Sequence, residues 1–100
     1  MLIVIVKLRT KPDRRENLIE LAKAVLWPSR GEEGCYAYDF LQDPFEPECF
    51  TFYEKWRSRN DLELHFNEPH FKLFDEKSKA TLTEPAQIVA FEVIREKKLS

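Results

Sequence analysis

CYAYDFLQDPFEPECFTFYEKW, residues 35–56, contains two runs rich in aromatic residues on either side of a proline-bearing loop. The runs 35–41 and 49–56 have the composition and length of β-strands, and the prolines of QDPFEPE interrupt regular structure between them. We therefore predict an antiparallel hairpin. The favoured register, which a slip of one residue would reverse, sets Tyr36, Tyr38 and Phe40 opposite Glu54, Phe52 and Phe50.

The segment before the hairpin predicts a strand and a helix. LIVIVKLRT, residues 2–10, is rich in β-branched residues and predicts a strand. Pro12 suits the start of a helix, and Asp13 with Glu16 resembles a capping box. Apolar residues then recur at helical spacing until Pro28, where we expect the helix to end. The turn GEEG, residues 31–34, holds both glycines of the chain.

The segment after the hairpin predicts a broken helix and a last strand. Ser58 with Asp61 marks an N-cap, and Pro69 starts a second helical piece that continues to about residue 80. AQIVAFEVI, residues 86–94, predicts the fourth strand. The order β-α-β-β-α-β predicts an α+β, ferredoxin-like fold with a four-stranded antiparallel sheet. We expect one domain over residues 1–96 and a polar tail over 97–100.

The two faces of the predicted sheet predict a partner. The first, third and fourth strands carry apolar or aromatic residues on both faces, yet two helices cover only one face of a four-stranded sheet. A second copy of the same sheet is the simplest cover for the other face. We therefore predict a homodimer with its sheets face to face and its helices outside.

Composition limits the classes of function. The 100 residues include 16 Lys and Arg and 18 Asp and Glu, with a net charge of −2 and no strong basic patch, so nucleic acid is not an expected partner. The apolar run LIVIV is too short for a membrane span or a signal peptide, which makes a cytoplasmic location the default expectation. Cys35 and Cys49 begin successive strands of one hairpin, too far apart for a disulfide, so we expect free thiols.

Four stretches together resemble the antibiotic biosynthesis monooxygenase domain, a family of dimeric α+β barrels. They are EEGCYAYDFLQDP, residues 32–44, FYEKWRSRNDLELHF, residues 52–66, EPHFKLF, residues 68–74, and the TEP turn before the last strand. The resemblance covers essentially the whole chain. It implies the fold more specifically than it implies the chemistry.

The resemblance implies several activities. One branch comprises cofactor-free monooxygenases of polycyclic phenols or quinols, one degrades haem, and one isomerises a phosphorylated quorum-sensing sugar derivative. The haem-degrading branch has an Asn on its first strand, and a Trp and a His on its second helix. This chain has no Asn in LIVIVKLR, and His65 and Asp75 stand at the two helical positions. All three positions differ from the residues of the haem-degrading branch, so haem degradation is not expected.

The only histidines, His65 and His70, are candidates for acid/base chemistry. A spacing of five residues rotates two helical side chains about 140° apart, and Pro69 intervenes, so no metal site is predicted. His65 shares a stripe with Leu62 and Phe66, so its ring should point inward. It is either a core histidine bonded to a backbone carbonyl or an imidazole lining a substrate cavity. His70 is expected to pack or cap at the surface, or to contact the substrate.

Glu54 is the second catalytic candidate, because it alternates with Phe52 and Trp56 on an aromatic face of the third strand. It either pairs with Arg57 or Arg59, or it orients His65, a water or a substrate hydroxyl. The aromatic candidates are either core or pocket walls. The residues predicted to contact substrate are Phe52, Tyr53, Trp56, His70, Phe71, Phe74 and Tyr36.

The chain has no phosphate-binding glycine loop, dinucleotide motif or catalytic triad. Together with the resemblance, this predicts a cofactor-independent monooxygenase that oxidises a small aromatic phenol or quinol with molecular oxygen. His65 would take the proton, and Tyr53 or Glu54 would hold the anion. The alternatives are an isomerase of a small phosphorylated dicarbonyl, which needs basic residues in its pocket, and a non-catalytic small-molecule-binding stress protein.

Overall fold

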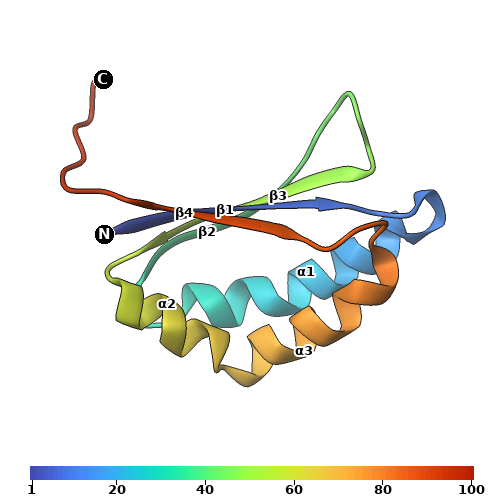
Figure 1. Ribbon diagram of the computed structural model, residues 1–100, viewed down its shortest axis with the longest axis horizontal. Coiled ribbons are helices and arrows are strands. Elements are labelled where there is room, and N and C mark those ends of the chain that lie inside the picture. The colour runs from blue at the N-terminus through green and yellow to red at the C-terminus, as the bar shows by residue number, and fades with distance from the viewer.

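The computed structural model describes residues 1–100 and has two layers, a four-stranded sheet with helices on one face (Figure 1). The strands are β1 (Leu2–Arg9), β2 (Cys35–Gln42), β3 (Cys49–Trp56) and β4 (Gln87–Glu92). The helices are α1 (Arg15–Arg30), α2 (Arg59–Phe66) and α3 (Pro69–Ser78), with short 3₁₀ turns η1 (Pro12–Arg14) and η2 (Lys79–Thr81). No helix is both long enough and apolar enough to span a membrane.

The sheet has the order β2-β3-β1-β4 with every neighbouring pair antiparallel, as the ferredoxin-like prediction requires. Alternate residues of β1 and β3 are fully buried beneath the helices, and their neighbours along each strand are only half-buried or exposed. The core therefore lies in a single layer between the sheet and the helices. Its members are Leu2, Val4, Val6, Leu8, Leu18, Ala22, Val25, Tyr38, Phe50, Phe52, Trp56, Leu62, Phe74 and Leu82.

The hairpin register differs from the prediction by two residues. Tyr38 lies opposite Glu54 and Phe40 lies opposite Phe52, while the ladder is irregular between Cys35 and Ala37. The loop closes more tightly than expected because the Asp43 carboxylate accepts the backbone N–H groups of Phe45 and Glu46, at 2.8 and 3.2 Å. A two-residue shift keeps Tyr38 and Phe40 on their predicted face, whereas Tyr36 lies at the irregularity and leaves it.

Two helix boundaries also differ from the prediction. α1 runs past Pro28 to Arg30, because a proline in the last turn removes only one hydrogen bond, and the N–H of Gly31 still bonds to the Trp27 and Pro28 carbonyls. The expected capping box of Asp13 and Glu16 does not form, since residues 12–14 make a 3₁₀ turn and neither helical start there has a side-chain cap. The predicted cap of α2 is confirmed: Ser58 Oγ accepts the Asp61 N–H at 3.2 Å.

The two cysteines lie at opposite ends of the β2–β3 ladder. Cys35 pairs in register with Trp56 at one end, whereas Cys49 lies opposite Arg9 at the other. Both thiols are free. Burial raises the pKa of the Cys35 thiol to about 11, which keeps it protonated and poorly nucleophilic at neutral pH.

Candidate functional site

His65 lies between α2 and the sheet and is 0% exposed. It points inward because it shares the buried face of α2 with Asp61 and Leu62. Three aromatic rings surround it, with ring centroids at 4.6 Å for Trp56, 5.0 Å for Phe71 and 5.4 Å for Tyr38. The inward orientation predicted from the sequence is therefore what the structure has.

His65 is held by a carboxylate rather than by a backbone carbonyl. Its Nδ1 lies 2.6 Å from Oε2 of Glu32, and Nε2 of His70 lies 2.8 Å from the same oxygen. The expectation that the two histidines diverge is wrong, because the chain leaves the helix at residues 67–68 and turns before α3 begins. We call Glu32, His65 and His70 the histidine–carboxylate cluster.

Glu32 was not a candidate from the sequence. It belongs to the turn between α1 and β2, 33 positions from His65, so no periodic pattern connects the two. The only feature of the sequence that marks Glu32 is the pair of acidic residues between two glycines, immediately before a predicted strand. Such a turn is more often solvated, whereas the Glu32 side chain here is only 13% exposed.

The proton positions in the cluster are inferred from its hydrogen bonds. An ionised carboxylate only accepts hydrogen bonds, so His65 Nδ1 and His70 Nε2 each donate to Glu32. In the neutral ring, His65 Nε2 is then an unprotonated acceptor, and the Tyr38 hydroxyl lies 3.5 Å from it. Burial lowers the pKa of His65, with Glu32 acting in the opposite direction, so the ring is neutral and basic at Nε2 at neutral pH.

The spacing within the cluster fits hydrogen bonds better than a metal ion. The three donor atoms all lie within 4.8 Å of one another, yet Glu32 Oε2 is only 2.6 and 2.8 Å from the two ring nitrogens. Two ligands of a tetrahedral zinc ion lie about 3.3 Å apart, given metal–ligand bonds of about 2.0 Å. The side chains would have to rearrange before they could hold a metal.

Glu54 lies on the same face of the sheet, directly opposite Tyr38, and is 4% exposed. The Trp56 indole N–H donates to Oε1 of Glu54 at 2.9 Å. Burial raises the pKa of Glu54 to about 7. At neutral pH its carboxyl group is therefore protonated in a large fraction of the molecules. It pairs with neither Arg57, which binds Asp61, nor Arg59, which lies by Glu63.

The remaining candidates divide between two faces of the sheet. Phe52, Trp56 and Phe74 are buried on the helix side, and Phe71 is half-buried beside His65. Tyr53 lies opposite Ile5 on the other face, and Tyr36 projects at the ladder irregularity and is 57% exposed. Tyr53 and Tyr36 are thus not brought together with His65, because a strand alternates its side chains and the irregularity turns Tyr36 outward.

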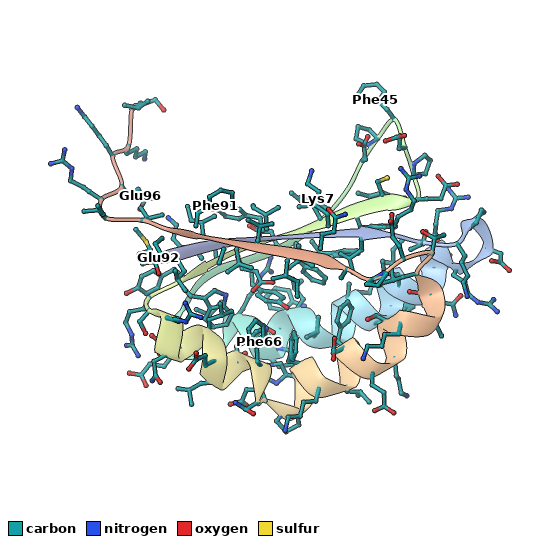
Figure 2. All side chains as sticks on the ribbon, in the orientation of Figure 1. Lys7, Phe45, Phe66, Phe91, Glu92 and Glu96 are labelled. Carbon is teal, nitrogen blue, oxygen red and sulfur yellow. The ribbon has the colours of Figure 1, made fainter.

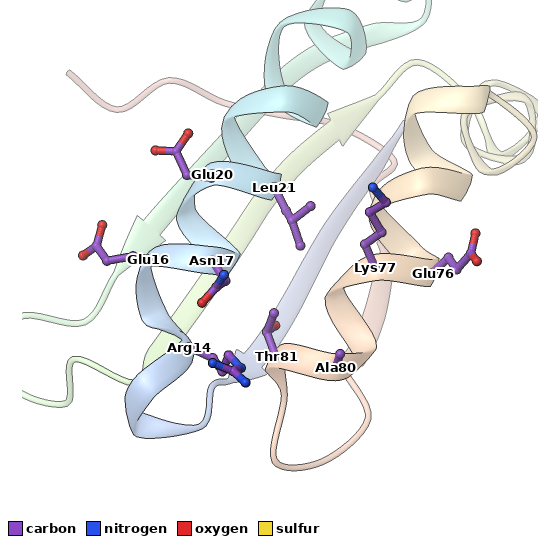
Figure 3. Close-up of a pocket in the computed structure, with 9 residues that line it drawn as sticks. All are labelled: Arg14, Glu16, Asn17, Glu20, Leu21, Glu76, Lys77, Ala80 and Thr81. Atoms are coloured by element: carbon purple, nitrogen blue, oxygen red, sulfur yellow. The ribbon is translucent and has the colours of Figure 1, made fainter.

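No principal cavity of the protein opens onto His65. One cavity, of about 740 Å³, is a groove between α1 and the α3–η2 segment (Figure 3). Its lining contains none of the predicted site residues; the lining residues are Arg14, Glu16, Asn17, Glu20, Leu21, Glu76, Lys77, Ala80 and Thr81. The space around His65 is instead filled by aromatic side chains.

Comparison with known proteins identifies the family. The family model described as antibiotic biosynthesis monooxygenase matches residues 1–77. The chain belongs to the antibiotic biosynthesis monooxygenase family. The structure of Rv0793 from Mycobacterium tuberculosis matches with a TM-score of 0.91 and 28% identity, over 97% of this chain and 98% of that one.

Curated proteins also match the chain, at different levels of identity. "Uncharacterized protein sll1783" of Synechocystis is 39% identical over 92% of this chain, which spans 63% of that relative's length. "Probable quinol monooxygenase YgiN" of Escherichia coli is 29% identical over 84% of this chain and 90% of its own length. Relatives with monooxygenase names and relatives with isomerase names both match. The fold and family are therefore shown, and the reaction is a separate question.

Proposed function

We propose that the protein is a cofactor-independent monooxygenase that oxidises a small aromatic phenol or quinol with molecular oxygen. The observation that carries the proposal is the bond between His65 Nδ1 and the half-buried Glu32 carboxylate, which leaves Nε2 of a fully buried ring as the base within an aromatic enclosure. Family membership and the name of the quinol monooxygenase relative support the reaction class. Because they support it by analogy, the proposal depends on the chemistry of His65.

The proposed reaction needs little from the protein beyond a base. His65 Nε2 takes the hydroxyl proton, and the electron-rich anion transfers an electron to O₂. The substrate radical and superoxide then combine to form a C–O bond at a ring carbon bearing hydrogen. Loss of that hydrogen and cleavage of the O–O bond leave a carbonyl oxygen on the ring and release the second oxygen atom, with both substrate hydrogens, as water. The substrate supplies all the reducing electrons, and His65 returns its proton to the departing oxygen.

Glu54 is the proposed partner of the substrate anion. With a pKa of about 7, its carboxylic acid form can donate a hydrogen bond from a site where Trp56 already fixes one oxygen. A neutral donor in a low-dielectric enclosure stabilises a phenolate without adding a second negative charge beside it. This role passes to Glu54 alone, because Tyr53 lies on the other face of the sheet.

Substrate entry in this proposal requires the aromatic cover to move. Phe66 and Phe71 are half-buried, contact each other at 4.9 Å between ring centroids, and lie 6.0 and 5.0 Å from the His65 ring. They come from the two sides of the break between α2 and α3. Rotation of these two rings would expose His65 to a flat substrate, which would then replace their packing.

The isomerase alternative receives less support from the geometry. A phosphorylated substrate needs cationic side chains, but the groups whose charges act on His65 are Glu32, His70 and Glu68. The nearby Arg57 is paired with Asp61. One observation does favour the second candidate, a non-catalytic small-molecule-binding protein: the interface between sheet and helices is filled with aromatic side chains.

Oxygen uptake distinguishes these functions. We expect the wild-type protein to consume oxygen with at least one member of a panel of hydroquinones and anthrones, one O₂ for each carbonyl formed and no peroxide released. His65→Gln and His65→Ala should lose at least about 100-fold in kcat, the scale of a removed general base. Glu63→Gln, on the exposed side of α2, is the matched control. Full turnover by both His65 variants would refute the proposed base, and no uptake by the wild-type protein would favour the binding protein.

The homodimer also remains a proposal. The sheet face away from the helices carries apolar side chains that no element of the chain covers; they include Ile3, Ile5, Val89 and Phe91. Phe91 projects from this face whereas Phe66 lies on the helix side (Figure 2). A second sheet laid on this face would remove these side chains from water.

A further inference from the structure

We propose that Glu32 and His70 are positioning residues that clamp His65 in its reactive tautomer. In this arrangement His70 Nε2–H holds Glu32 Oε2, and that oxygen holds His65 Nδ1–H, so the lone pair of His65 Nε2 faces the interior. The inference rests on the proposed function for its catalytic consequence. Its structural content, which nitrogen carries the proton and why, can be tested without any substrate.

The shared oxygen is the centre of the clamp. Both histidines approach Glu32 Oε2, at 2.6 and 2.8 Å, and neither ring has another acceptor at its bonded nitrogen. Charge-assisted hydrogen bonds of this length are about twice as strong as neutral ones. A carboxylate with two N–H donors on one oxygen has little freedom to rotate, so the orientation of the His65 ring is also restricted.

The groups that surround Glu32 leave the two imidazoles as the donors that hold its carboxylate. His65 is contributed by α2, His70 and the neighbouring Glu68 lie at the start of α3, and Glu54 and Tyr38 lie on the sheet beneath. Glu68 and Glu54 are acidic, and the Tyr38 hydroxyl lies by His65 Nε2, so the N–H groups of the two imidazoles are the donors that hold Glu32 Oε2. When His65 takes a proton, its imidazolium forms beside an existing counter-ion and needs no movement of solvent.

The clamp runs from the interior towards the surface. The side-chain exposure is 0% for His65, 13% for Glu32 and 18% for His70. His70 therefore shields the carboxylate from water that would otherwise compete for Oε2. This position explains how a histidine outside the aromatic enclosure can influence the basicity of one inside it.

Nuclear magnetic resonance tests the clamp in the substrate-free protein. Long-range ¹H–¹⁵N correlation spectra at pH 8 should show His65 protonated at Nδ1 and unprotonated at Nε2. Because Glu32 raises the pKa of His65, Glu32→Gln should lower that pKa further, whereas Glu33→Gln, in the same turn with a side chain 88% exposed, should leave it unchanged. A His65 protonated at Nε2, or the same His65 titration in Glu32→Gln and the wild-type protein, would overturn the inference.

Kinetics with an active quinol tests the catalytic consequence. Glu32→Gln and His70→Ala should lower kcat at least about tenfold with KM changed less than about threefold, and the acid limb for Glu32→Gln should move to lower pH. His70→Gln keeps an N–H donor and should recover much of the loss, while Lys72→Gln on α3 is the control. A normal pH profile in Glu32→Gln, with His65→Gln inactive, would overturn the clamp and leave the proposed function standing. Circular dichroism confirms that each variant is folded.

Discussion

At the scale of single residues, the interior of this protein contains two ionisable side chains, His65 and Glu54. Burial shifts their pKa values in opposite directions. Burial lowers the pKa of His65 and raises the pKa of Glu54 to about 7, so each is biased towards its neutral form. A neutral base and a neutral acid, both of which contact Trp56, are the combination that the proposed deprotonation and anion binding require.

The buried carboxyl group predicts how stability depends on pH. The folded pKa of Glu54 is about 7 and its ordinary value is 4.5, so the folded state binds the proton more tightly and stability falls as pH rises between these values. Glu54→Gln removes this loss and keeps an acceptor for Trp56. We expect Glu54→Gln to exceed the wild-type free energy of unfolding by about 3 kcal/mol at pH 8, with little difference at pH 4. Urea denaturation at both pH values measures this, and equal differences at the two would contradict it.

The same two groups predict a bell-shaped pH dependence of kcat/KM. Activity should rise as His65 loses its proton, with a midpoint below the ordinary histidine value, and fall as Glu54 loses its proton near pH 7. Glu54→Gln should abolish the alkaline limb and leave the acid limb in place. Oxygen uptake across pH 4.5–9 checks this; an unchanged alkaline limb would remove Glu54 from the proposed mechanism.

Sequence reasoning reached some of these residues and missed others for a physical reason. The inward position of His65 follows from helical periodicity, and the aromatic face of Glu54 follows from strand alternation, both of which are local patterns. Glu32 contacts His65 only because a turn and a helix converge in space. The spacing of residues within one segment does not predict such a contact. The meeting of His70 with the same oxygen depends on the bend between α2 and α3.

At the scale of elements, the turn before β2 packs against the start of α2 through a glycine. A Cβ on Gly34 would lie 2.2 Å from Cγ of Asp61, and Asp61 is fixed there by Arg57 and Ser58. The same turn carries Glu32, so this close approach brings the carboxylate within reach of His65. Gly34 is required here for its size, since neither glycine has a positive φ.

This contact predicts a difference between the two glycines of the turn. Gly34→Ala should destabilise the protein by about 2–3 kcal/mol, because the overlap can be relieved only by moving the backbone or displacing Asp61 from its partners. Gly31→Ala is the matched control, since the nearest atom to its added Cβ is 3.4 Å away. Thermal unfolding followed by circular dichroism compares them. Equal stability of the two variants would contradict the packing argument.

Elements were more predictable than the relations between them. The order of strands and helices, the cap of α2 and the restart at Pro69 follow from composition and capping chemistry, and the structure confirms them. The hairpin register was wrong because Asp43 tightens the loop and the ladder is irregular after Cys35. The first cause is a side-chain bond whose effect on loop length the residue type alone does not fix, and the second is a backbone irregularity that has no mark in the sequence.

At the scale of the whole molecule, the uncovered sheet face predicts assembly. Val89 and Phe91 are 51% and 53% exposed and flank the half-buried Ile3 and Ile5. We expect a dimer at micromolar concentration by solution scattering, and Phe91→Lys should shift it towards monomer by placing an unpaired charge in the interface. Leu73→Lys, on the helix side, should remain dimeric. A wild-type monomer under these conditions would contradict the prediction.

The proposed dimer involves the sheet, whereas the proposed substrate entry involves the helices. The sheet face is proposed to be fixed against its partner, while the break between α2 and α3 is proposed to open over His65. A protein built in this way keeps one face rigid and leaves the short helices free to admit a substrate.

The central claim is that a phenolic substrate reaches His65 Nε2, and a crystal structure of the protein with a hydroquinone bound under anaerobic conditions tests it most directly. We predict a substrate hydroxyl within about 3 Å of Nε2, with Phe66 and Phe71 rotated away from their present positions. A hydroquinone bound only in the groove between α1 and α3, with the rings around His65 still packed, would contradict the account.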